Sequence, residues 1–396
     1  MGYDMTAAEA AQRLGVKQAT LYAYVSRGVL TRVRAADGRG SLFDADEVER
    51  LALRGRPRRP AGAADITVES KITEITADQL RYRGEDAVEL AGSRSLEDVA
   101  ELLWAGRLPA EPVPYWHASH PALVSGQAAQ AALPGGTLPL ERFQVIVPAM
   151  AATDPLRLQL DPAAVMAAGR GIAAGMVDCL PPQAARTGLS VAARLWSRLC
   201  ETRPSPGLLR AMSAALVLLA DHELAASTLA ARAAASVRAD PYAVVATGLG
   251  AVGGALHGGS SLGAEALLGS ANGSPAEVPR VVGELLRRGE RVPGFGHFIY
   301  KSGDPRAIAL LGLIRRAAPK SAQLAVADSV LAEVRQKSLP EPNIDFALAT
   351  LSRVAGMVTG AAEAIFAVAR TTGWIAHALE AYTTAPIRPR AVYTGP

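Results

Sequence analysis

Cysteines, aromatic residues and long hydrophobic runs are all scarce in this chain of 396 residues. The two cysteines, Cys179 and Cys200, have no metal-site spacing and are too few for a disulfide framework, which predicts a reducing, cytoplasmic setting and no bound metal. The longest apolar stretch, near residues 211–220, is far too short to span a bilayer, and the first residues contain no signal-peptide core. We therefore expect no membrane partner.

The hydrophobic residues are mostly small or aliphatic. They make up 49% of the chain, whereas aromatic residues make up only 5% and charged residues 20%. A core built from Ala, Leu and Val favours helices, because Ala and Leu are among the strongest helix formers. The length allows two or three domains, so the composition predicts a mostly α fold with a large buried core.

Positive charge is concentrated at the N-terminus. The first sixty residues hold eleven Lys or Arg and seven Asp or Glu. Their net charge of +4 equals the net charge of the whole chain. The remaining residues hold thirty of each sign and are neutral. This asymmetry indicates an anionic partner for the N-terminal segment.

The pattern of this basic segment predicts a small helical module, residues 1–54. Thr6 and Glu9 form a capping box that opens a first helix, and residues 18–26 form a second one after a glycine turn. A basic hairpin over residues 32–39, with an Asp-Gly turn, precedes a third helix near 44–51. The order resembles the winged helix-turn-helix of MerR-type and excisionase-type DNA binders.

If the module binds DNA, residues 18–26 would enter the major groove and the hairpin would contact the backbone or the minor groove. The residues expected to take part are Lys17, Thr20, Arg32, Arg34 and Arg39. Its seven acidic residues leave a second interpretation open, a protein-interaction or regulatory appendage. Residues 55–65, basic and then rich in Pro, Gly and Ala, are interpreted as a linker.

The remaining chain, residues 66–396, begins with a short β-alternating stretch over 65–75 and then becomes largely helical. Ser95 and Asp98 cap a helix that Gly106 should close, because its apolar positions follow helical spacing.

Two histidines lie in unusual local settings. His222 stands between Asp221 and Glu223, a setting that by itself usually marks a surface or capping residue. His257 is flanked by glycines in GGALHGGSS, which let the backbone approach a ligand closely. The helix expected after it would favour a neutral imidazole that donates a hydrogen bond. A structural His in a glycine-rich turn is the alternative.

A third motif, VPGFGHFIYKSGDPRA at 292–307, combines His297 with Lys301 and Arg306. Freed backbone amides and two cations suit an anion such as a CoA phosphate or a carboxylate. Asp345 lies in an otherwise apolar run, where a carboxylate either caps a helix or serves as a general base. Arg370 and Arg388 are cations near apolar segments, and each alone would be an ordinary surface arginine.

Taken in order, these segments resemble the citrate synthase family over residues 66–396, in a subgroup with an N-terminal MerR-like helix-turn-helix domain. The matching segments are LRYRGEDAVELA, DHE with ST, ALHGG, PGFGH with YK and DPRA, NIDF, ARTTGWIAHALE and RPRAVYTG. The resemblance implies a large helical domain and a smaller one at about 258–355 that closes over the substrate.

The resemblance also implies a role for each residue. Asp345 would take a proton from the acyl-CoA α-carbon, His257 would stabilise the enol, and His297 would polarise the ketone of a 2-oxo acid. The substrate carboxylates would be held by His222, Arg306, Arg370 and Arg388. CoA would bind at Pro293, Gly294, Phe295, Gly296 and Lys301. Because the family takes the last arginine from a neighbouring subunit, a homodimer is implied; the CoA thioester is a substrate, and no cofactor is expected.

Four positions depart from the family's commonest pattern, namely Ala225, Phe298, Ala347 and Leu348. They alter the substrate walls without removing a catalytic group. Three hypotheses follow. The first is citrate synthesis from acetyl-CoA and oxaloacetate. The second is the same chemistry on another pair, such as 2-methylcitrate synthesis from propionyl-CoA and oxaloacetate, or a related cleavage run backwards, and the third is a DNA-binding regulator that senses metabolites. The third needs no base, so the presence of Asp345 favours an enzyme.

Overall fold

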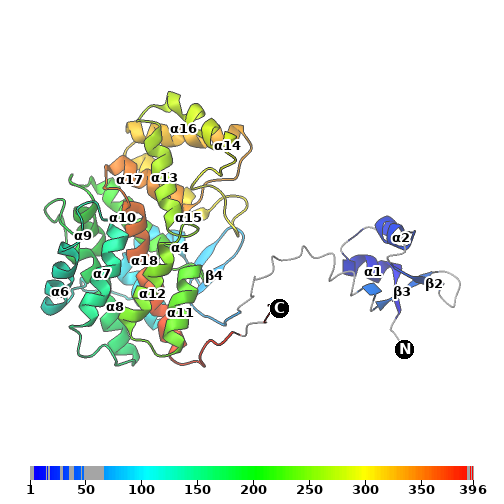
Figure 1. Ribbon diagram of the computed structural model, residues 1–396, viewed down its shortest axis with the longest axis horizontal. Helices are drawn as coiled ribbons and strands as arrows, with labels where there is room; N and C mark the ends of the chain where they lie inside the picture. Colours follow the sequence, from blue (N-terminus) through cyan, green and yellow to red (C-terminus); the bar gives the residue numbers. More distant parts are fainter. Residues whose placement is uncertain are drawn as a thin grey trace. The chain divides into compact units, whose positions relative to one another are not determined.

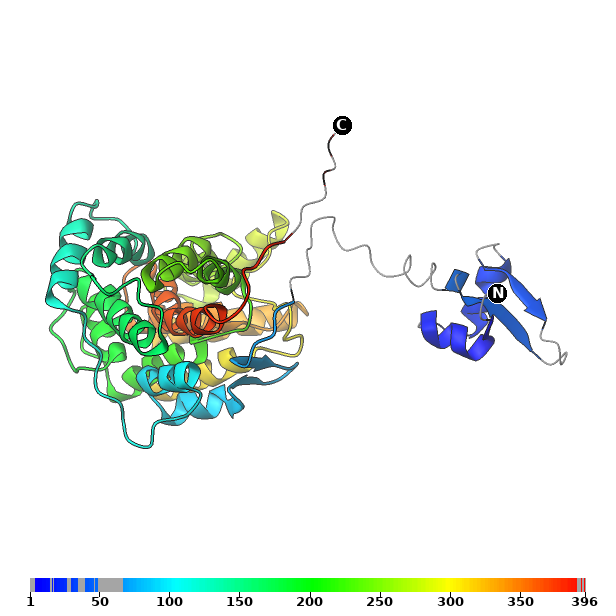
Figure 2. The same cartoon turned by 90° about the horizontal axis from the view of Figure 1, so that it is seen from below.

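The computed structural model describes residues 4–14, 16, 18–26, 30–34, 40–45, 47–48, 67–389, 393 and 395. The chain divides into two compact units, residues 1–68 and 69–396 (Figures 1 and 2). The predicted linker at 55–65, together with Lys17 and Arg39, lies outside the described residues.

The N-terminal unit combines two helices with a three-stranded antiparallel sheet in the order β1-β3-β2. Its elements are β1 (Asp4–Thr6), α1 (Ala7–Leu14), α2 (Gln18–Ser26), β2 (Arg32–Arg34) and β3 (Ser41–Asp44). The predicted helix pair is confirmed. Of the hairpin predicted over residues 32–39, strand β2 is present, but it pairs with β3 at Ser41–Asp44, and the predicted Asp-Gly turn lies outside the described residues. Strand β1 was not predicted, because its pairing with β3 joins positions almost forty residues apart.

Local capping explains where the helices of this unit begin. The backbone N–H of Thr6 donates to Glu9 Oε2 at 2.8 Å and Glu9 N donates to Thr6 Oγ1 at 3.3 Å, which is the predicted capping box. Asp44 Oδ1 accepts from Glu47 N at 2.9 Å, at the start of the next helical residues. The small core of this unit consists of Ala10, Ala11, Leu21, Leu30, Phe43 and Val48.

The larger unit is almost entirely helical after a short antiparallel sheet of β4 (Thr73–Ile75), β5 (Leu80–Tyr82) and β6 (Glu85–Asp86). Its helices are α4 (Ala87–Ser93), α5 (Leu96–Ala105), α6 (His120–Ala131), α7 (Pro139–Ala151), α8 (Pro162–Cys179), α9 (Val191–Leu199), α10 (Pro206–Leu219), α11 (Ala226–Ser236), α12 (Pro241–Val252), α13 (Gly259–Ser270), the 3-10 helix η1 (Pro275–Glu277), α14 (Val278–Arg287), α15 (Pro305–Ala317), α16 (Ala322–Gln336), α17 (Ile344–Ala355) and α18 (Ala361–Ala381). The predicted mostly α fold is confirmed.

Helix α5 begins and ends at the predicted residues. Ser95 and Asp98 form a reciprocal capping box, and Gly106 ends the helix in the left-handed region at φ 78°. Its apolar side chains are buried, so a purely local signal fixed both ends of the helix.

Helix α18 is the centre of the larger unit. All of its 21 residues except Leu379 and Glu380 are buried, and it packs against α5, α7, α8, α10, α11, α12, α13 and α17. In both views it runs through the middle of the surrounding helices (Figures 1 and 2). A helix that is covered on every side needs small apolar residues, which its many alanines supply.

Helices α13 to α17 pack on one another: α13, α15 and α16 contact α17, and α14 contacts α16. They fall within residues 258–355, the predicted smaller domain, whose boundary stays a prediction. Helices α15 and α17 also contact α10, and α17 contacts α18, so this group meets the helices that carry the candidate site. In the described parts of the chain, no helix is long and apolar enough to cross a membrane.

Candidate functional site

Two of the predicted histidines lie side by side with a tyrosine. The ring centroids of His222 and His297 are 5.4 Å apart, and Tyr300 stacks on His297 at 4.7 Å. The Tyr300 hydroxyl lies 3.2 Å from His222 Nε2. Burial raises the pKa of Tyr300 to about 12, so its hydroxyl keeps its proton at neutral pH.

The turn before Tyr300 fixes the tautomer of His297. Its Nδ1 accepts from the backbone N–H groups of Ile299 at 3.1 Å and Tyr300 at 3.2 Å, so the proton of a neutral ring is on Nε2. Burial, and then the charge of Arg306, lower the pKa of His297. The ring is therefore a neutral donor.

Glycine is required in the turn that leads to His297. Gly294 adopts φ 82°, and a Cβ there would lie 2.8 Å from Phe346 Cβ at the start of α17. The close approach brings this turn against the helix that carries Asp345.

His257 lies two residues before α13 and is half-buried. Its Nε2 is 2.8 Å from Ser227 Oγ, and its ring meets Phe366 edge-on at 5.5 Å. Burial, followed by the charge of Arg370, lowers the pKa of His257 to about 4. The sequence predicted a neutral imidazole from the helix dipole, whereas burial and a nearby cation make it neutral here.

Asp345 lies in the first turn of α17 and does not cap it. The cap is Asn343, whose Oδ1 accepts from the Asp345 backbone N–H at 3.0 Å. Asp345 Oδ1 instead accepts from Ser261 Oγ at 2.7 Å. Burial raises the pKa of Asp345, although hydrogen bonds from Ser261 and Ser260 and the charge of Arg306 oppose the rise. A carboxylate in this setting suits a general base.

Two buried arginines make the site cationic. Arg306 pairs with Asp304 through Nε at 2.9 Å and Nη2 at 2.8 Å. Burial alone would lower the pKa of Arg306, but the Asp304 carboxylate outweighs burial and raises it. The Arg306 guanidinium lies over the Tyr300 ring, 5.6 Å from its centroid.

Arg370 has a spare donor. Its Nε donates to the Leu219 carbonyl at 2.9 Å, while Nη1 is buried without a hydrogen-bond partner among the described atoms. Burial lowers the pKa of Arg370 to about 10, so it stays charged at neutral pH. The guanidinium also lies 4.6 Å from the Phe366 ring centroid. A buried cation with an unused donor is suited to an anionic ligand.

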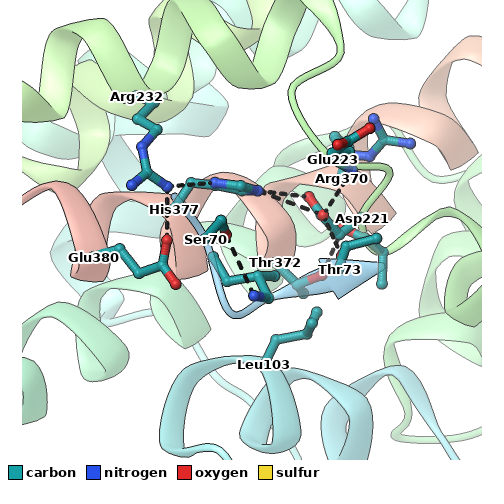
Figure 3. A network of polar contacts seen from close by, with 12 residues as sticks. Ser70, Thr73, Leu103, Asp221, Glu223, Arg232, Arg370, Thr372, His377 and Glu380 are labelled. Carbon is teal, nitrogen blue, oxygen red and sulfur yellow. Dashed lines mark hydrogen bonds and ion pairs between the residues drawn. The ribbon is translucent and has the colours of Figure 1, made fainter. Parts of the chain in front are cut away.

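His222 is held in a tight turn. Glu223 has φ 54°, and its backbone N–H donates to Asp221 Oδ2 at 3.1 Å. Burial, with the charges of Arg306 and Arg370, places the pKa of His222 well below its ordinary value. Figure 3 shows Asp221 within a network that continues to His377.

A cavity of about 910 Å³ opens beside His297 and Tyr300. Three of the five residues predicted to bind CoA line it: Phe295, Gly296 and Lys301. Pro293 and Gly294 are not among its lining residues. Lys301 Nζ donates to the His297 carbonyl at 3.0 Å, and the cavity is lined by two cations, Arg291 and Lys301, and two carboxylates, Glu290 and Glu341.

Arg388 is exposed in the segment that follows α18. Within the described part of the chain, it makes no hydrogen bond or ion pair with the site. The preceding Ile387 donates its backbone N–H to Ser236 Oγ of α11 at 3.1 Å. Of the predicted DNA contacts, Arg32 and Arg34 are exposed on β2, and Thr20 is half-buried on α2.

Sequence reasoning missed several residues that support the predicted ones: Ser227, Ser261, Tyr300, Asp304 and His377. Each lies inside or next to a motif already singled out, as Ser261 does in GGALHGGSS. Proximity to a motif was the available signal. Asp304 pairs with Arg306 two residues away, but the partners of the other four residues are distant in sequence.

Family models match both units. The model described as citrate synthase, C-terminal domain, matches residues 62–390, and the model described as MerR HTH family regulatory protein matches residues 5–55.

Individual proteins agree with these matches. The chain is 31% identical to citrate synthase 2 of Bacillus subtilis, over 84% of this chain and 94% of the relative. It is 30% identical to a 2-methylcitrate synthase of Mycobacterium tuberculosis, over 86% and 91%. The ternary complex of Thermoplasma acidophilum citrate synthase with carboxymethyl coenzyme A and oxaloacetate aligns with a TM-score of 0.70 at 25% identity, covering 85% of this chain and 96% of that one. The chain therefore belongs to the citrate synthase family, as a transferase of the citrate synthase type that carries a MerR-like helix-turn-helix segment.

Proposed function

We propose that this protein condenses acetyl-CoA with oxaloacetate to form citrate and CoA. The observation that carries the proposal is one site that combines a half-buried carboxylate, Asp345, with neutral His257 and His297 and with the buried cations Arg306 and Arg370. Citrate synthases act on a CoA thioester as substrate and use no cofactor. The two thiols are buried and unpaired, which supports a cytoplasmic location.

In the proposed first step, Asp345 removes a proton from the acetyl methyl group. We assign Ser227 Oγ, 2.8 Å from His257 Nε2, as the donor of this hydrogen bond, which leaves Nδ1–H to donate to the thioester oxygen as negative charge develops there. A neutral donor suits this role, since it stabilises the enol without protonating it fully.

In the second step, the enol carbon attacks the ketone carbon of oxaloacetate and forms the new C–C bond. His297 Nε2–H faces the ketone oxygen and supplies the proton that the alkoxide needs. Water then cleaves the C–S bond of the citryl thioester and releases CoA. His222, Arg306 and Arg370 would hold the oxo-acid carboxylates, because arginine matches a carboxylate with two parallel donors.

Arg388 would complete this clamp from a neighbouring subunit. Its exposure, and its lack of a contact with the site of its own chain among the described residues, support a homodimer in which the terminal segments are exchanged. Sedimentation analysis of the full-length protein would test this, and a monomer with full activity would contradict it.

The function is tested by thiol release from acetyl-, propionyl- and butyryl-CoA with several 2-oxo acids. Fastest turnover with acetyl-CoA and oxaloacetate supports the proposal. Preference for propionyl-CoA would instead indicate 2-methylcitrate synthesis, an alternative that the Mycobacterium tuberculosis relative supports. No thiol release with any pair would overturn the enzymatic proposal and favour a metabolite sensor.

DNA binding by the N-terminal unit is a second proposed function. Its support is the MerR match and the exposed Arg32 and Arg34 of β2, with Arg32 lying 5.8 Å from the Tyr22 ring centroid. A gel-shift with fragments of the protein's own promoter region, titrated with salt, tests it. The R32A/R34A variant should lose retardation, whereas R316A/K320A, which removes two exposed cations from the other unit, should keep it. No retardation of the full-length protein at low salt would leave a synthase with a non-DNA-binding appendage.

A further inference from the structure

We propose that His377 is a positioning residue for the oxo-acid end of the site, because its Nε2–H holds Asp221 and thereby the turn that carries His222. The identity of the ligand rests on the proposed function. No role for His377 came from the sequence motifs, although it lies in the same segment as Arg370.

His377 and Arg370 share one face of α18. They are seven residues apart, roughly two helical turns, and each is 1% exposed. Gly373 lies between them, and a Cβ there would clash with the Asp221 carboxylate and lie 2.5 Å from the Ala220 carbonyl oxygen. The turn that holds His222 therefore packs directly on the backbone of α18, between the two side chains.

Arg232 determines the state of the His377 ring. Its Nη1 lies 2.9 Å from His377 Nδ1, and a guanidinium can only donate, so Nδ1 must accept. The ring is then neutral, with its proton on Nε2, which lies 3.4 Å from each carboxylate oxygen of Asp221. The same Arg232 nitrogen donates to Glu380 Oε2 at 2.7 Å. Figure 3 shows Arg232, His377 and Asp221 in a row, with Glu380 beside Arg232.

The Asp221 carboxylate is fully buried and depends on few donors. Oδ2 accepts from Thr73 Oγ1 at 2.6 Å and from Glu223 N at 3.1 Å, while Oδ1 has no partner that meets hydrogen-bond geometry. Burial alone would raise the pKa of Asp221, but the hydrogen bond from His377, the charge of Arg370 and the hydrogen bond from Thr73 hold it below its ordinary value. Removing the His377 donor would leave a buried charge under-satisfied, which is costly.

The turn has a strained backbone that Asp221 stabilises. Glu223, at φ 54°, is kept in the left-handed region by its hydrogen bond to the Asp221 side chain. Residue 222 lies between them, so a shift of Asp221 moves the His222 ring relative to Tyr300. A displacement of this kind should weaken binding of the oxo acid while leaving the CoA cavity intact.

Two variants separate the two hydrogen bonds of His377. His377→Gln places an amide N–H near the position of Nε2 and can still donate to Asp221, whereas His377→Asn places an amide oxygen near Nδ1 and keeps only the bond from Arg232. Steady-state kinetics of the full-length protein with acetyl-CoA and oxaloacetate compare them. H377N should raise the oxaloacetate KM roughly tenfold with the acetyl-CoA KM nearly unchanged, and H377Q should stay within about threefold of wild type. The matched control is His117→Asn, which changes an exposed histidine three residues before the start of α6.

Each outcome has a defined meaning. Equal oxaloacetate KM values for H377N and wild type, or parallel changes in both substrates' KM for H377Q and H377N, would overturn the inference. If neither His377 variant folds, Thr73→Val decides, since it removes one donor to Asp221 and should raise the oxaloacetate KM alone. An inactive wild type would reject the proposed function instead, before any variant is compared.

Discussion

Burial acts in opposite directions on the acid and the histidines of this site. It raises the pKa of Asp345, lowers that of His257 to about 4, and lowers that of His297. Both imidazoles are therefore neutral donors near neutral pH, beside a carboxylate that is a stronger base than one in water. A hydrogen bond from Ser261 orients Asp345, and a hydrogen bond between Ser227 and Nε2 orients His257.

Asp345→Ala should abolish CoA release while oxo-acid binding is retained. Loss of a general base slows the chemical step by about 10²–10⁴-fold or more, and the variant leaves the carboxylate-binding cations in place. Single-turnover thiol release measures the first effect and isothermal titration with oxaloacetate the second. Normal turnover of the variant would contradict the assigned role. Asp328→Ala, at a surface ion pair with Arg315, is the control.

Ser261→Ala should move the acidic limb of the pH–rate profile to higher pH. The Ser261 hydrogen bond stabilises the ionised carboxylate and lowers the pKa of Asp345, so its loss raises that pKa further. Since the base must be deprotonated to act, activity on the acidic side is lost at a higher pH than in wild type. The pH dependence of kcat measures this. Ser270→Ala, on the exposed end of the same helix, should leave the profile in place.

At the scale of elements, α18 organises both the interior and the site. Phe366 and Arg370 face His257, and His377 faces the turn at Asp221. Near its first turn, Glu265 of α13 accepts from the backbone N–H groups of Gly360 and Ala362. Glu363 of α18 is buried near Glu265, so two acidic side chains from different helices meet close to the start of α18.

Glu363→Gln should stabilise the protein at alkaline pH. Burial, and then the charges of Glu265, Glu141 and Asp345, raise the pKa of Glu363 to about 7. Below the ordinary value of 4.5 both folded and unfolded states are protonated, and the wild type loses stability as pH rises from there through 7. The variant removes this loss, which is on the order of 1–3 kcal/mol above pH 7.

Thermal unfolding across pH 4 to 9 would measure the difference between E363Q and wild type. The difference in stability between E363Q and wild type should grow between about pH 4.5 and 7 and then stay constant. Glu111→Gln, at an exposed glutamate, should follow the wild type. A gap that does not depend on pH would contradict the assigned titration.

At the scale of the whole molecule, the larger unit is anchored through its first residues. Arg232 Nη2 donates to the Glu69 carbonyl at 3.3 Å, Lys71 N donates to Glu380 Oε1 at 2.9 Å, and Thr73 bonds to Asp221. The first residues of the larger unit thus join the same buried network that holds the His222 turn.

Truncation should reveal this anchor. A variant of residues 67–396 should keep its activity, because every candidate catalytic residue and the anchoring segment remain. A variant of residues 75–396 should lose activity and stability, since it lacks the Thr73 bond to Asp221 and the fully buried Ile72. Thiol release and thermal unfolding compare the two. Equal behaviour of the two truncated proteins would show that residues 67–74 are dispensable.

Local signals in the sequence determined much of the helical framework and the chemistry of the motifs. Ser95 and Gly106 define the ends of α5, and residues 18–26 form α2 as predicted, because caps and turn residues act on neighbouring backbone groups. The types and order of the motifs around His222, His257, His297 and Asp345 identified the family without coordinates.

The tertiary structure decided which groups meet. Ser261 and Asp345 are 84 positions apart, and Asp221 and His377 are 156 apart, so no local pattern could pair them. It also made Asn343, and not Asp345, the cap of α17, which frees the carboxylate for Ser261. The physical reason is that burial and hydrogen bonding depend on packing between distant segments, and these two effects set the protonation and direction of each group in the site.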